Sequence, residues 1–280
     1  MESFDQSLLS ALQDVELISA RPLSGGLTNR CWLLTIRNVT SGQYTSLVWR
    51  PIAASSSAFG VSRQYEYQVL ALIAPSGIAP KPAYLLEHGL LVEWIEGEEA
   101  GNELSDTTLL KLQADIHTLP VPHWRLDVQK RAAHYWQFIP QHFKTPELIS
   151  IFHCFQDQPL QTKFAETCCH HDLGRYNIIR ADNGRNVVID WEYAAAGDPS
   201  LDLALTINAN GLEPNGAVKM YCQHRGISNN QPWLDAVVDW QPWCDYLAML
   251  WFFVGADIWQ DQTYVESANQ LQQKLSFLPR

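Results

Sequence analysis

The sequence predicts a two-lobed α+β protein, with a β-rich lobe over residues 1–97 and a helical lobe over residues 98–280. Two observations predict this architecture. Up to Gly97, short apolar runs of strand type alternate with Gly and Pro turns, and one stretch has helical spacing. Beyond Gly97, apolar residues recur mostly at helical intervals, and strand-type runs return only between residues 168 and 194.

The first lobe is expected to contain about five strands and one helix. RPLSGGLTNRCWLLTI predicts a strand, a Gly-Gly turn and a second strand, and SLVWRP predicts a third strand that Pro51 ends. KPAYLLEHG and LLVEWIEG predict a hairpin-like pair that stops at Gly97. Before this pair, SRQYEYQVLALIA has helical apolar spacing, and Ser62 is its expected N-cap.

The second lobe is expected to be mostly helical. SDTTLLKLQADIHTLP begins with a Ser or Asp cap and stops before Pro120, and HYWQFIPQHF and ELISIFHCFQ have helical patterns too. Long helices rich in tryptophan are predicted from DPSLDLALTINA to the end of the sequence.

The composition disfavours some classes of function. The 280 residues carry 30 acidic against 19 basic side chains, a formal net charge of −11, which disfavours a nucleic-acid surface and favours a cationic or neutral small-molecule partner. The acidic N-terminus lacks the features of a secretory signal, and the most apolar window, residues 246–256, is too short to cross a bilayer. We therefore expect a cytoplasmic protein that binds neither nucleic acid nor membrane, and the sequence leaves its oligomeric state open.

The six cysteines are expected to be reduced packing residues. They stand at positions 31, 154, 168, 169, 222 and 244, and none forms a C-x-x-C pair typical of zinc ribbons or thioredoxin-like sites. Cys168 and Cys169 are neighbours in the sequence, which is poor geometry for a mutual disulfide. A redox site is therefore not expected.

The stretch HHDLGRYNII, which starts at His170, has the pattern H-x-D-x-x-x-x-N and contains Asp172 and Asn177. The apolar strand VVIDWE follows and carries Asp190 at its end. Phosphoryl transfer requires such groups, because one carboxylate accepts the proton of the attacking hydroxyl while an amide oxygen and a second carboxylate hold Mg²⁺. Carboxylate and carbonyl oxygens suit Mg²⁺, whereas His and Cys ligands suit Zn²⁺.

Together these motifs resemble the small-molecule branch of the eukaryotic-like kinase fold, which includes the aminoglycoside phosphotransferases and the choline, ethanolamine and thiamine kinases. IDWEYAAAGDPSLDLA is similar to this family over its whole length, including the D-P-x-x-D-L-A helix start. LSGGLTNRCW resembles its first hairpin, VEWIEG its interlobe hinge and LQADIHTLP the following helix. The resemblance implies a protein-kinase-like fold in which residues 1–97 bind the nucleotide and residues 98–280 hold the catalytic loop and the acceptor pocket.

The resemblance also implies roles for the motif residues. Asp172 would be the catalytic base and would orient the substrate hydroxyl. Asn177 and Asp190 would bind Mg²⁺, and ATP would be the phosphoryl donor, although the sequence does not distinguish ATP from GTP. His170 would brace the loop rather than bind a metal.

A further set of residues is expected to bind the nucleotide. Protein kinases use a strand lysine on the α and β phosphates, and we predict that Arg50 takes this role here and pairs with Glu66 of the following helix. The hinge would bond the adenine through backbone groups of Glu93, Trp94 and Ile95. A short glycine loop, which lacks the pattern G-x-G-x-x-G, would offer backbone N–H groups to phosphate from the segment that holds Gly25, Gly26, Thr28 and Asn29. For Arg50 the competing interpretation is a surface arginine at the end of a strand, and for the glycine loop it is a plain hairpin turn.

The acceptor is expected to be a small molecule. The segment after Asp190 leaves no room for the activation segment of a protein kinase, and Gly174 stands where protein kinases place a catalytic lysine. Aromatic rings beside carboxylates hold organic cations, and the C-terminal helices are rich in both, although core packing also explains tryptophans at helical spacing. The acceptor-pocket residues that we expect are Glu192, Trp240, Trp243 and Trp251.

Within the family, IAPKP, IDWEYA and DWQPWCDYLAMLWFF resemble bacterial thiamine kinases most, and GGLTN and DWEYA are shared with bacterial choline kinases. Thiamine is therefore the first expected acceptor, choline or ethanolamine the second, and an aminoglycoside the third. Two other classes remain open: a non-catalytic binding protein of kinase fold and a metal-dependent phosphohydrolase. A metal-dependent phosphohydrolase would need further histidines at helical spacing, and the sequence has no H-x-x-x-H.

Overall fold

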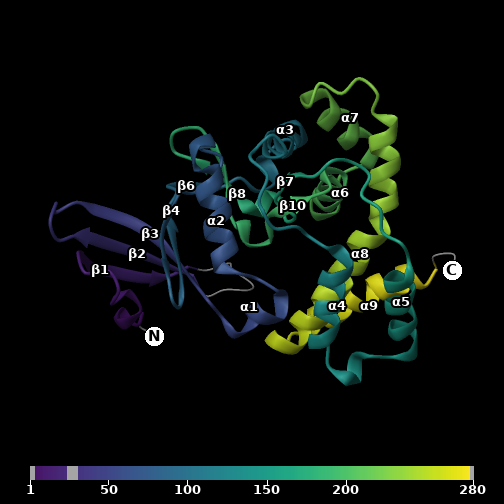
Figure 1. Cartoon of the computed structure of the whole chain (residues 1–280), viewed down its shortest axis with the longest axis horizontal. Coiled ribbons are helices and arrows are strands. Elements are labelled where there is room, and N and C mark those ends of the chain that lie inside the picture. The colour runs from purple at the N-terminus through teal and green to yellow at the C-terminus, as the bar shows by residue number, and fades with distance from the viewer. Residues whose placement is uncertain (1–3, 24–30, 278–280) are drawn as a thin grey trace. The chain divides into compact units, whose positions relative to one another are not determined.

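The computed structural model describes residues 4–23 and 31–277, and the chain divides into two compact units. Unit 1 takes residues 1–56, 61–101 and 176–193, and unit 2 takes residues 57–60, 102–175 and 194–280. Most strands belong to unit 1 and most helices to unit 2 (Figure 1), so the predicted α+β class is confirmed. The chain returns to unit 1 for residues 176–193 after its long stretch in unit 2.

Unit 1 is built on an antiparallel sheet of five strands in the order β1-β2-β3-β5-β4. Alternate residues of β2 and β3, such as Leu34 and Leu47, are buried beneath it, as expected for a sheet with one apolar face. The strands are β1 (Val15–Pro22), β2 (Trp32–Asn38), β3 (Tyr44–Pro51), β4 (Pro82–Leu86) and β5 (Gly89–Glu93). All five were predicted, but β1 begins earlier than the run that we expected.

Helix α2 (Arg63–Ile73) packs against β4 and β5 (Figure 1). The predicted N-cap is confirmed, since Ser62 Oγ accepts a hydrogen bond from the N–H of Tyr65 at 3.3 Å. The short helix α1 (Ala54–Phe59) was not predicted, because the segment ASSSAF has no apolar periodicity to reveal it.

A second, three-stranded sheet of unit 1 has the order β6-β8-β9. Its strands are β6 (Gly97–Glu99), β8 (Ile178–Ala181) and β9 (Asn186–Val188). A short 3₁₀ helix precedes the β8–β9 hairpin at η5 (Arg175–Asn177), and another follows it at η6 (Trp191–Tyr193). This hairpin is the strand-type region that the sequence predicted after residue 168.

Unit 2 is a helical assembly around the long helix α8, which packs against α6 and α9 (Figure 1). Its two short strands, β7 (Thr167–Cys169) and β10 (Ala195–Gly197), pair antiparallel next to the loop that follows β7. The helices are α3 (Asp106–Ile116), α4 (Val128–Phe138), α5 (Pro146–Asp157), α6 (Pro199–Asn210), α7 (Pro214–His224), α8 (Gln231–Trp259) and α9 (Gln262–Ser276).

One predicted helix begins and ends earlier than expected. The pattern of HYWQFIPQHF indicated continuous helix, but α4 ends at Phe138 and a separate 3₁₀ turn, η4 (Gln141–Phe143), follows. Pro140 lies between them, has no N–H to donate and disfavours helical backbone in the residue before it. Among residues 4–23 and 31–277, no helix combines the length and the apolar character needed to span a membrane.

Candidate active site

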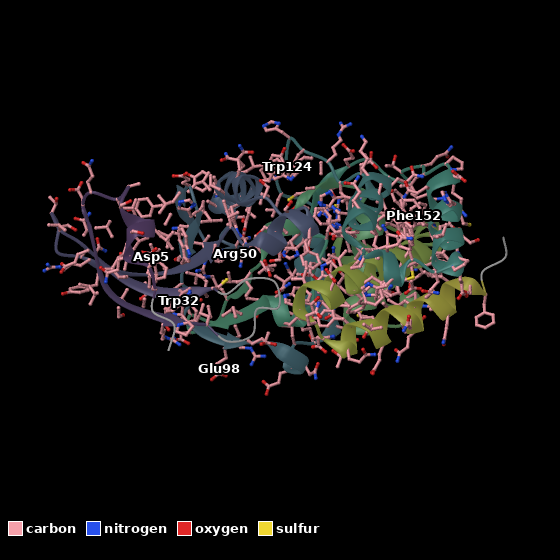
Figure 2. All side chains as sticks on the ribbon, turned by 90° about the horizontal axis from the view of Figure 1, so that it is seen from below. Asp5, Trp32, Arg50, Glu98, Trp124 and Phe152 are labelled. Atoms are coloured by element: carbon pink, nitrogen blue, oxygen red, sulfur yellow. The ribbon has the colours of Figure 1, made fainter. Side chains whose placement is uncertain are left out.

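Arg50 (labelled in Figure 2) lies near the end of β3 and is the centre of an ion-pair cluster in unit 1. Its Nε is 2.7 Å from Glu66 Oε1, on the first turn of α2. Its Nη2 is 2.5 Å from Asp190 Oδ1 and 3.2 Å from Glu192 Oε2. The expected Arg50–Glu66 pair is therefore present, and the same guanidinium also contacts a carboxylate that we expect to bind Mg²⁺.

Arg63, the first residue of α2, is a second guanidinium of this cluster. Its Nη1 pairs with Glu66 and lies 3.0 Å from Glu192 Oε2. Its Nε donates to the carbonyl of Pro51 at 3.2 Å. The side chains of Arg63, Glu66 and Glu192 are at most 2% exposed. Three carboxylates thus share two guanidiniums, and buried charges of this kind are tolerated only when paired.

Burial and the neighbouring charges shift the pKa values in the cluster. Burial, followed by the charge of Asp190, raises the pKa of Glu192 to about 7. Burial alone lowers the pKa of Arg50, but the charges of Glu66 and Asp190 outweigh burial and hold it well above its usual range. Arg50 is therefore a permanent positive charge beside Asp190.

The β8–β9 hairpin brings the two expected Mg²⁺ ligands together. Ile178 pairs with Val188 across the hairpin, and the N–H of Ile189 donates to the carbonyl of Asn177 at 2.8 Å. The register therefore places Asn177 opposite the residue before Asp190. Asp190 has a φ of 63°, a left-handed conformation that Asp adopts more readily than most residues.

Asp172 lies on the loop that follows β7 in unit 2. Its N–H donates to His170 Nδ1 at 3.3 Å, and the N–H of Gly174 donates to the carbonyl of Asp172 at 3.0 Å. The side chain of Asp172 is partly exposed, whereas His170 is fully buried. The contact between His170 and the Asp172 N–H is of the kind that a histidine bracing the loop would make. The role of Asp172 as the catalytic base stays a prediction.

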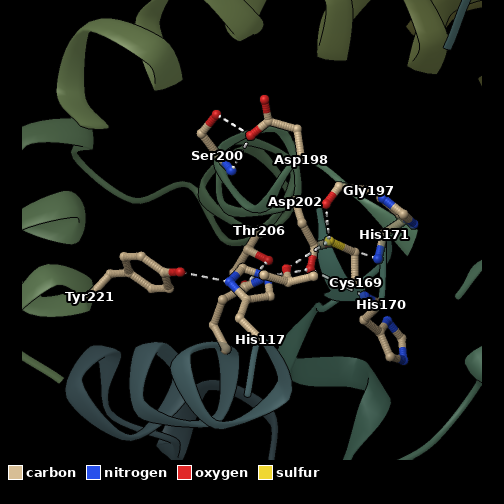
Figure 3. Close-up of polar contacts among 12 residues, drawn as sticks. His117, Cys169, His170, His171, Gly197, Asp198, Ser200, Asp202, Thr206 and Tyr221 are labelled. Carbon is tan, nitrogen blue, oxygen red and sulfur yellow. Dashed lines mark hydrogen bonds and ion pairs between the residues drawn. The ribbon is translucent and has the colours of Figure 1, made fainter. Parts of the chain in front are cut away.

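Asp202, in the first turn of α6, holds the start of this loop (Figure 3). Its carboxylate accepts the N–H groups of His170 at 3.1 Å and His171 at 2.6 Å, together with His117 Nε2 at 2.9 Å and Gln113 Nε2 at 2.7 Å. Burial raises the pKa of Asp202, but the hydrogen bond from His117 and the charge of His171 outweigh burial and hold it well below its usual range. An ionised carboxylate therefore anchors the loop.

Asn210, at the last turn of α6, holds the other end of the loop. Its Oδ1 accepts the N–H of Arg175 at 3.0 Å, and its Nδ2 donates to the carbonyl of Leu173 at 2.9 Å. Arg175 in turn donates from Nε to the carbonyl of Leu104 at 3.0 Å and pairs with Asp106. One helix of unit 2 thus fixes the loop at both ends.

A profile of the phosphotransferase enzyme family matches residues 19–237, which include the Arg50 cluster, the loop of Asp172 and the β8–β9 hairpin. The chain belongs to this family. It is therefore a small-molecule kinase, as the motifs predicted.

Characterised relatives and solved structures agree with this family. The thiamine kinase of Escherichia coli O157:H7 (strain EC4115 / EHEC) is 27% identical over 212 residues, which are 75% of this chain and 76% of the relative. The choline kinase LicA from Streptococcus pneumoniae has a TM-score of 0.72 at 18% identity, over 98% of this chain and 97% of that one. The GDP complex of wild-type aminoglycoside 2'-phosphotransferase-IIIa has a TM-score of 0.62 at 14% identity, over 96% of both chains. The expected kinase-like fold is confirmed.

The residues that we expect to form the hinge lie at the end of β5 and just beyond it. The N–H of Glu93 donates to the carbonyl of Lys81 at 2.8 Å, and the N–H of Trp94 donates to the carbonyl of Ser46 at 3.2 Å. Because both groups are engaged within unit 1, we expect the backbone of Ile95 to donate to an adenine. The expected phosphate contacts of Gly25, Gly26, Thr28 and Asn29 lie outside the described residues.

The three tryptophans expected in the acceptor pocket all lie on α8 of unit 2, in different environments. Trp240 is buried and donates from Nε1 to Ser200 Oγ at 3.0 Å. Trp243 is buried against Phe155 and also lines a cavity of about 240 Å³ between α5, α8 and α9. Trp251 is partly exposed and belongs to a ring cluster with Phe59. Their contact with an acceptor, and that of the paired Glu192, stays a prediction.

Sequence reasoning did not assign roles to Arg63, His117, Asp202 and Asn210. Arg63 and Glu66 are three residues apart at a helix start, a spacing that places them side by side. The buried acid of the D-P-x-x-D-L-A segment was noticed only as part of the resemblance. Its side-chain partners, Gln113 and His117, lie more than eighty residues away in the sequence, so no local pattern could have indicated these contacts.

Proposed function

We propose that this kinase transfers the γ-phosphoryl group of ATP to the primary hydroxyl of a small cationic alcohol, and that this alcohol is thiamine. The observation that carries the proposal is the cluster in which Arg50 contacts Glu66 and Asp190. A kinase needs such a cation, held by a helix carboxylate, to bind phosphates beside its metal ligand. The choice of thiamine is supported by the similarity to thiamine kinases at 27% identity.

Each part of the chain has a role in this proposal. Asp172 accepts the proton of the acceptor hydroxyl while that oxygen bonds to the γ-phosphorus and the bond to the leaving ADP breaks. Arg50 binds the α and β phosphates, and the backbone of Ile95 binds the adenine. His170 keeps Asp172 in place through the contact to the Asp172 N–H.

The donor set fits Mg²⁺. Asn177 supplies an amide oxygen and Asp190 a carboxylate, both hard oxygen ligands, and Asn177 lies across the hairpin from Ile189, the residue before Asp190. When bound, Mg²⁺ neutralises charge on the β and γ phosphates. The fit is favoured further because Glu66, Asp190 and Glu192 outnumber the two guanidiniums around them.

The net charge of −11 and the aromatic C-terminal helices suit an acceptor with a positive charge. Thiamine and choline both combine a quaternary nitrogen with a primary hydroxyl, so choline or ethanolamine is the second candidate and an aminoglycoside the third. The choline kinase and aminoglycoside phosphotransferase structures support only the fold at 18% and 14% identity. We expect the reaction to take place in the cytoplasm, where ATP is available.

The test is a panel of acceptors with purified full-length protein and Mg²⁺. Thiamine, choline, ethanolamine and kanamycin are each offered with ATP or GTP, and phosphorylated product is quantified by mass spectrometry. The proposal expects the highest kcat/KM for thiamine with ATP. A higher value for choline would replace thiamine as acceptor, and no transfer to any of the four would refute the proposal. Omission of Mg²⁺ should abolish transfer.

A further inference from the structure

The connection between β3 and α2 passes through both units of the chain. Residues 57–60, at the end of helix α1 and just beyond it, belong to unit 2, whereas the rest of the connection belongs to unit 1. In unit 1 the two ends of the connection are held together, because Arg63 Nε donates to the carbonyl of Pro51 at 3.2 Å. Residues 52–62 therefore form a loop whose base is closed beside Arg50 and whose tip lies in unit 2.

Phe59, at the tip of this loop, packs into a group of aromatic rings of unit 2. Its side chain is fully buried, and its ring stacks on Trp259 with the centroids 5.2 Å apart and an interplanar angle of 12°. The ring of Trp251 is also 5.2 Å away, and Tyr135 meets Phe59 edge-on at 6.5 Å and 71°. We call Tyr135, Trp251 and Trp259 the aromatic cage. Such ring pairs attract each other beyond the burial of their area, so the cage holds Phe59 in a specific position.

The shape of the aromatic cage depends on a glycine of α8. The ring of Trp259 lies against Gly255, where an added Cβ would be 2.4 Å from a ring atom. Tyr264 of α9 packs against the same ring, with the centroids 5.0 Å apart. A side chain at position 255 would displace the ring on which Phe59 stacks.

Helix α4 holds the backbone of the tip as well. Arg131 Nη1 donates to the carbonyl of Phe59 at 2.8 Å, and His134 Nε2 donates to the carbonyl of Ser57 at 2.7 Å. Gly60 then turns the chain with a φ of 64°, and a Cβ there would lie 3.2 Å from Arg131 Nη1. A residue with a side chain would be strained in this conformation. The tip is thus fixed through a side chain and through its backbone.

Two other interpretations of these residues explain less. The aromatic cage could be an open box for an organic cation, but the ring of Phe59 already takes the stacking position on Trp259. Phe59 could also be a core residue that matters for stability alone. However, it is carried by a loop whose two ends meet at Arg63 and Pro51, so its release would also free the ends of that loop.

The base of the loop is part of the ion-pair cluster. Arg63, which closes the base, also pairs with Glu66. Pro51 directly follows Arg50, which pairs with the same carboxylate. With the tip fixed, these groups keep their places before a nucleotide arrives, and binding costs less. With the tip released, residues 52–62 gain conformational freedom that nucleotide binding would have to remove.

We propose that Phe59 is a positioning residue for the nucleotide site. Its docking in the aromatic cage fixes the loop of residues 52–62. Through Arg63 at the base, the fixed loop holds Arg50 and Glu66 in the positions that receive the nucleotide. Phe59 is fully buried and acts without touching the nucleotide. The effect on ATP rests on the proposed function, in which Arg50 binds the phosphates, whereas the effect on the loop does not.

Three variants and one control test the inference. Phe59→Ala removes the ring from the aromatic cage, Phe59→Leu keeps a large apolar side chain, and Gly60→Ala strains the tip while the cage stays intact. Phe253→Ala, at a buried position of α8, is the matched control for loss of stability. Hydrogen exchange of peptides over residues 52–62 and 63–73, thermal unfolding, Kd for ATP by calorimetry, and kcat are measured for each.

The inference expects Phe59→Ala to accelerate exchange of residues 52–62 about tenfold and to raise Kd for ATP about tenfold, because the loop must then be ordered on binding. Exchange at Tyr65 and Glu66, at the start of α2, should rise about threefold. At saturating ATP, kcat should change less than about twofold. Phe59→Leu should stay within about threefold of the wild-type exchange and Kd, and Gly60→Ala should lie between the two variants of Phe59.

Unchanged exchange of the loop, or an unchanged Kd for ATP, in Phe59→Ala would overturn the inference. So would a Phe253→Ala variant that reproduces the rise in Kd at the same loss of thermal stability. If Phe59→Ala does not fold, Gly60→Ala decides between the same outcomes. Should the wild-type protein bind neither ATP nor GTP while exchange of the loop still follows the expected order, the proposed function fails and the fixing of the loop by Phe59 stands.

Discussion

The two regions that carry the expected active-site residues are stabilised by different interactions. In unit 1, Arg50 and Arg63 are held by direct ion pairs with three carboxylates. In unit 2, the loop of Asp172 is held by hydrogen bonds between its backbone and two side chains of α6, the buried, ionised Asp202 and Asn210. The first arrangement leaves charges that can exchange partners with phosphates and a cation. The second fixes a backbone conformation.

This difference has a physical reason. A nucleotide and its metal bring charge into a site, so groups that bind them must be charged before the ligand arrives and must have partners meanwhile. A base must instead be presented at one place, because misplacement by about 1 Å costs about 100-fold in rate. We therefore expect changes in unit 1 to act first on nucleotide binding and changes around the loop to act on kcat.

The largest effect is expected for Asp172→Asn. Removal of a general base should lower kcat by about 10³-fold while ATP binding, measured by calorimetry, changes little. Asp157→Asn, on the last turn of α5 in the same unit, is an isosteric control that should leave kcat unchanged. Near-normal turnover of Asp172→Asn would break the comparison, since the chemistry would then not depend on this loop.

Arg50→Ala is expected to have the next largest effect, through the nucleotide. Loss of the guanidinium removes one cation from Glu66, Asp190 and Glu192, while Arg63 still pairs with Glu66 and Glu192, and kcat/KM for ATP should fall about 100-fold. Arg50→Lys should recover only part of the lost kcat/KM for ATP, because an ammonium cannot contact the separate carboxylates as the planar guanidinium does. A variant with normal KM for ATP and reduced kcat alone would contradict the assignment of binding to unit 1.

Asp202 predicts a pH dependence of stability. Its pKa is depressed in the folded state, so its contribution is present above the unfolded value of about 3.9 and is lost as pH falls through the folded value. Asp202→Asn should lower the free energy of unfolding by about 3 kcal/mol at pH 7. Urea unfolding of both proteins between pH 7 and pH 3 should show this difference shrinking below about pH 4. A difference that does not vary with pH would mean that the charge of Asp202 is not what anchors the loop.

The smallest effect concerns the thiols beside the loop. Burial raises the pKa of Cys168 to about 12, and raises that of Cys169 well above its usual range, so both stay protonated and unreactive. An aromatic disulfide reagent at pH 8 should react fastest with the partly exposed Cys154, and more slowly with the partly exposed Cys31, because burial raises the pKa of Cys31. All six thiols should react after unfolding. Rapid labelling of Cys168 or Cys169, located by peptide mass spectrometry, would show that the loop opens more easily than its hydrogen bonds indicate.

Much of the site could be predicted because its residues follow each other in short motifs. His170, Asp172 and Asn177 lie within eight positions, and Asp190 ends the next strand. The pairing of Arg50 with Glu66 was also predictable, since a strand end followed by a helix start brings such residues close. Helix α1 and the break at Pro140 show the limits, because a short helix without apolar periodicity gives no signal and a helical pattern can hide a proline stop.

By itself, the sequence determined the fold class, the kind of chemistry and the identity of the motif residues, because these depend on periodicity and on chemically distinctive side chains at short spacing. Only the tertiary structure decided that Arg63 joins the cluster and that Asp202, which also contacts His117, anchors the loop. These contacts join side chains from segments far apart in the chain, at distances set by packing. A linear pattern contains no record of such distances.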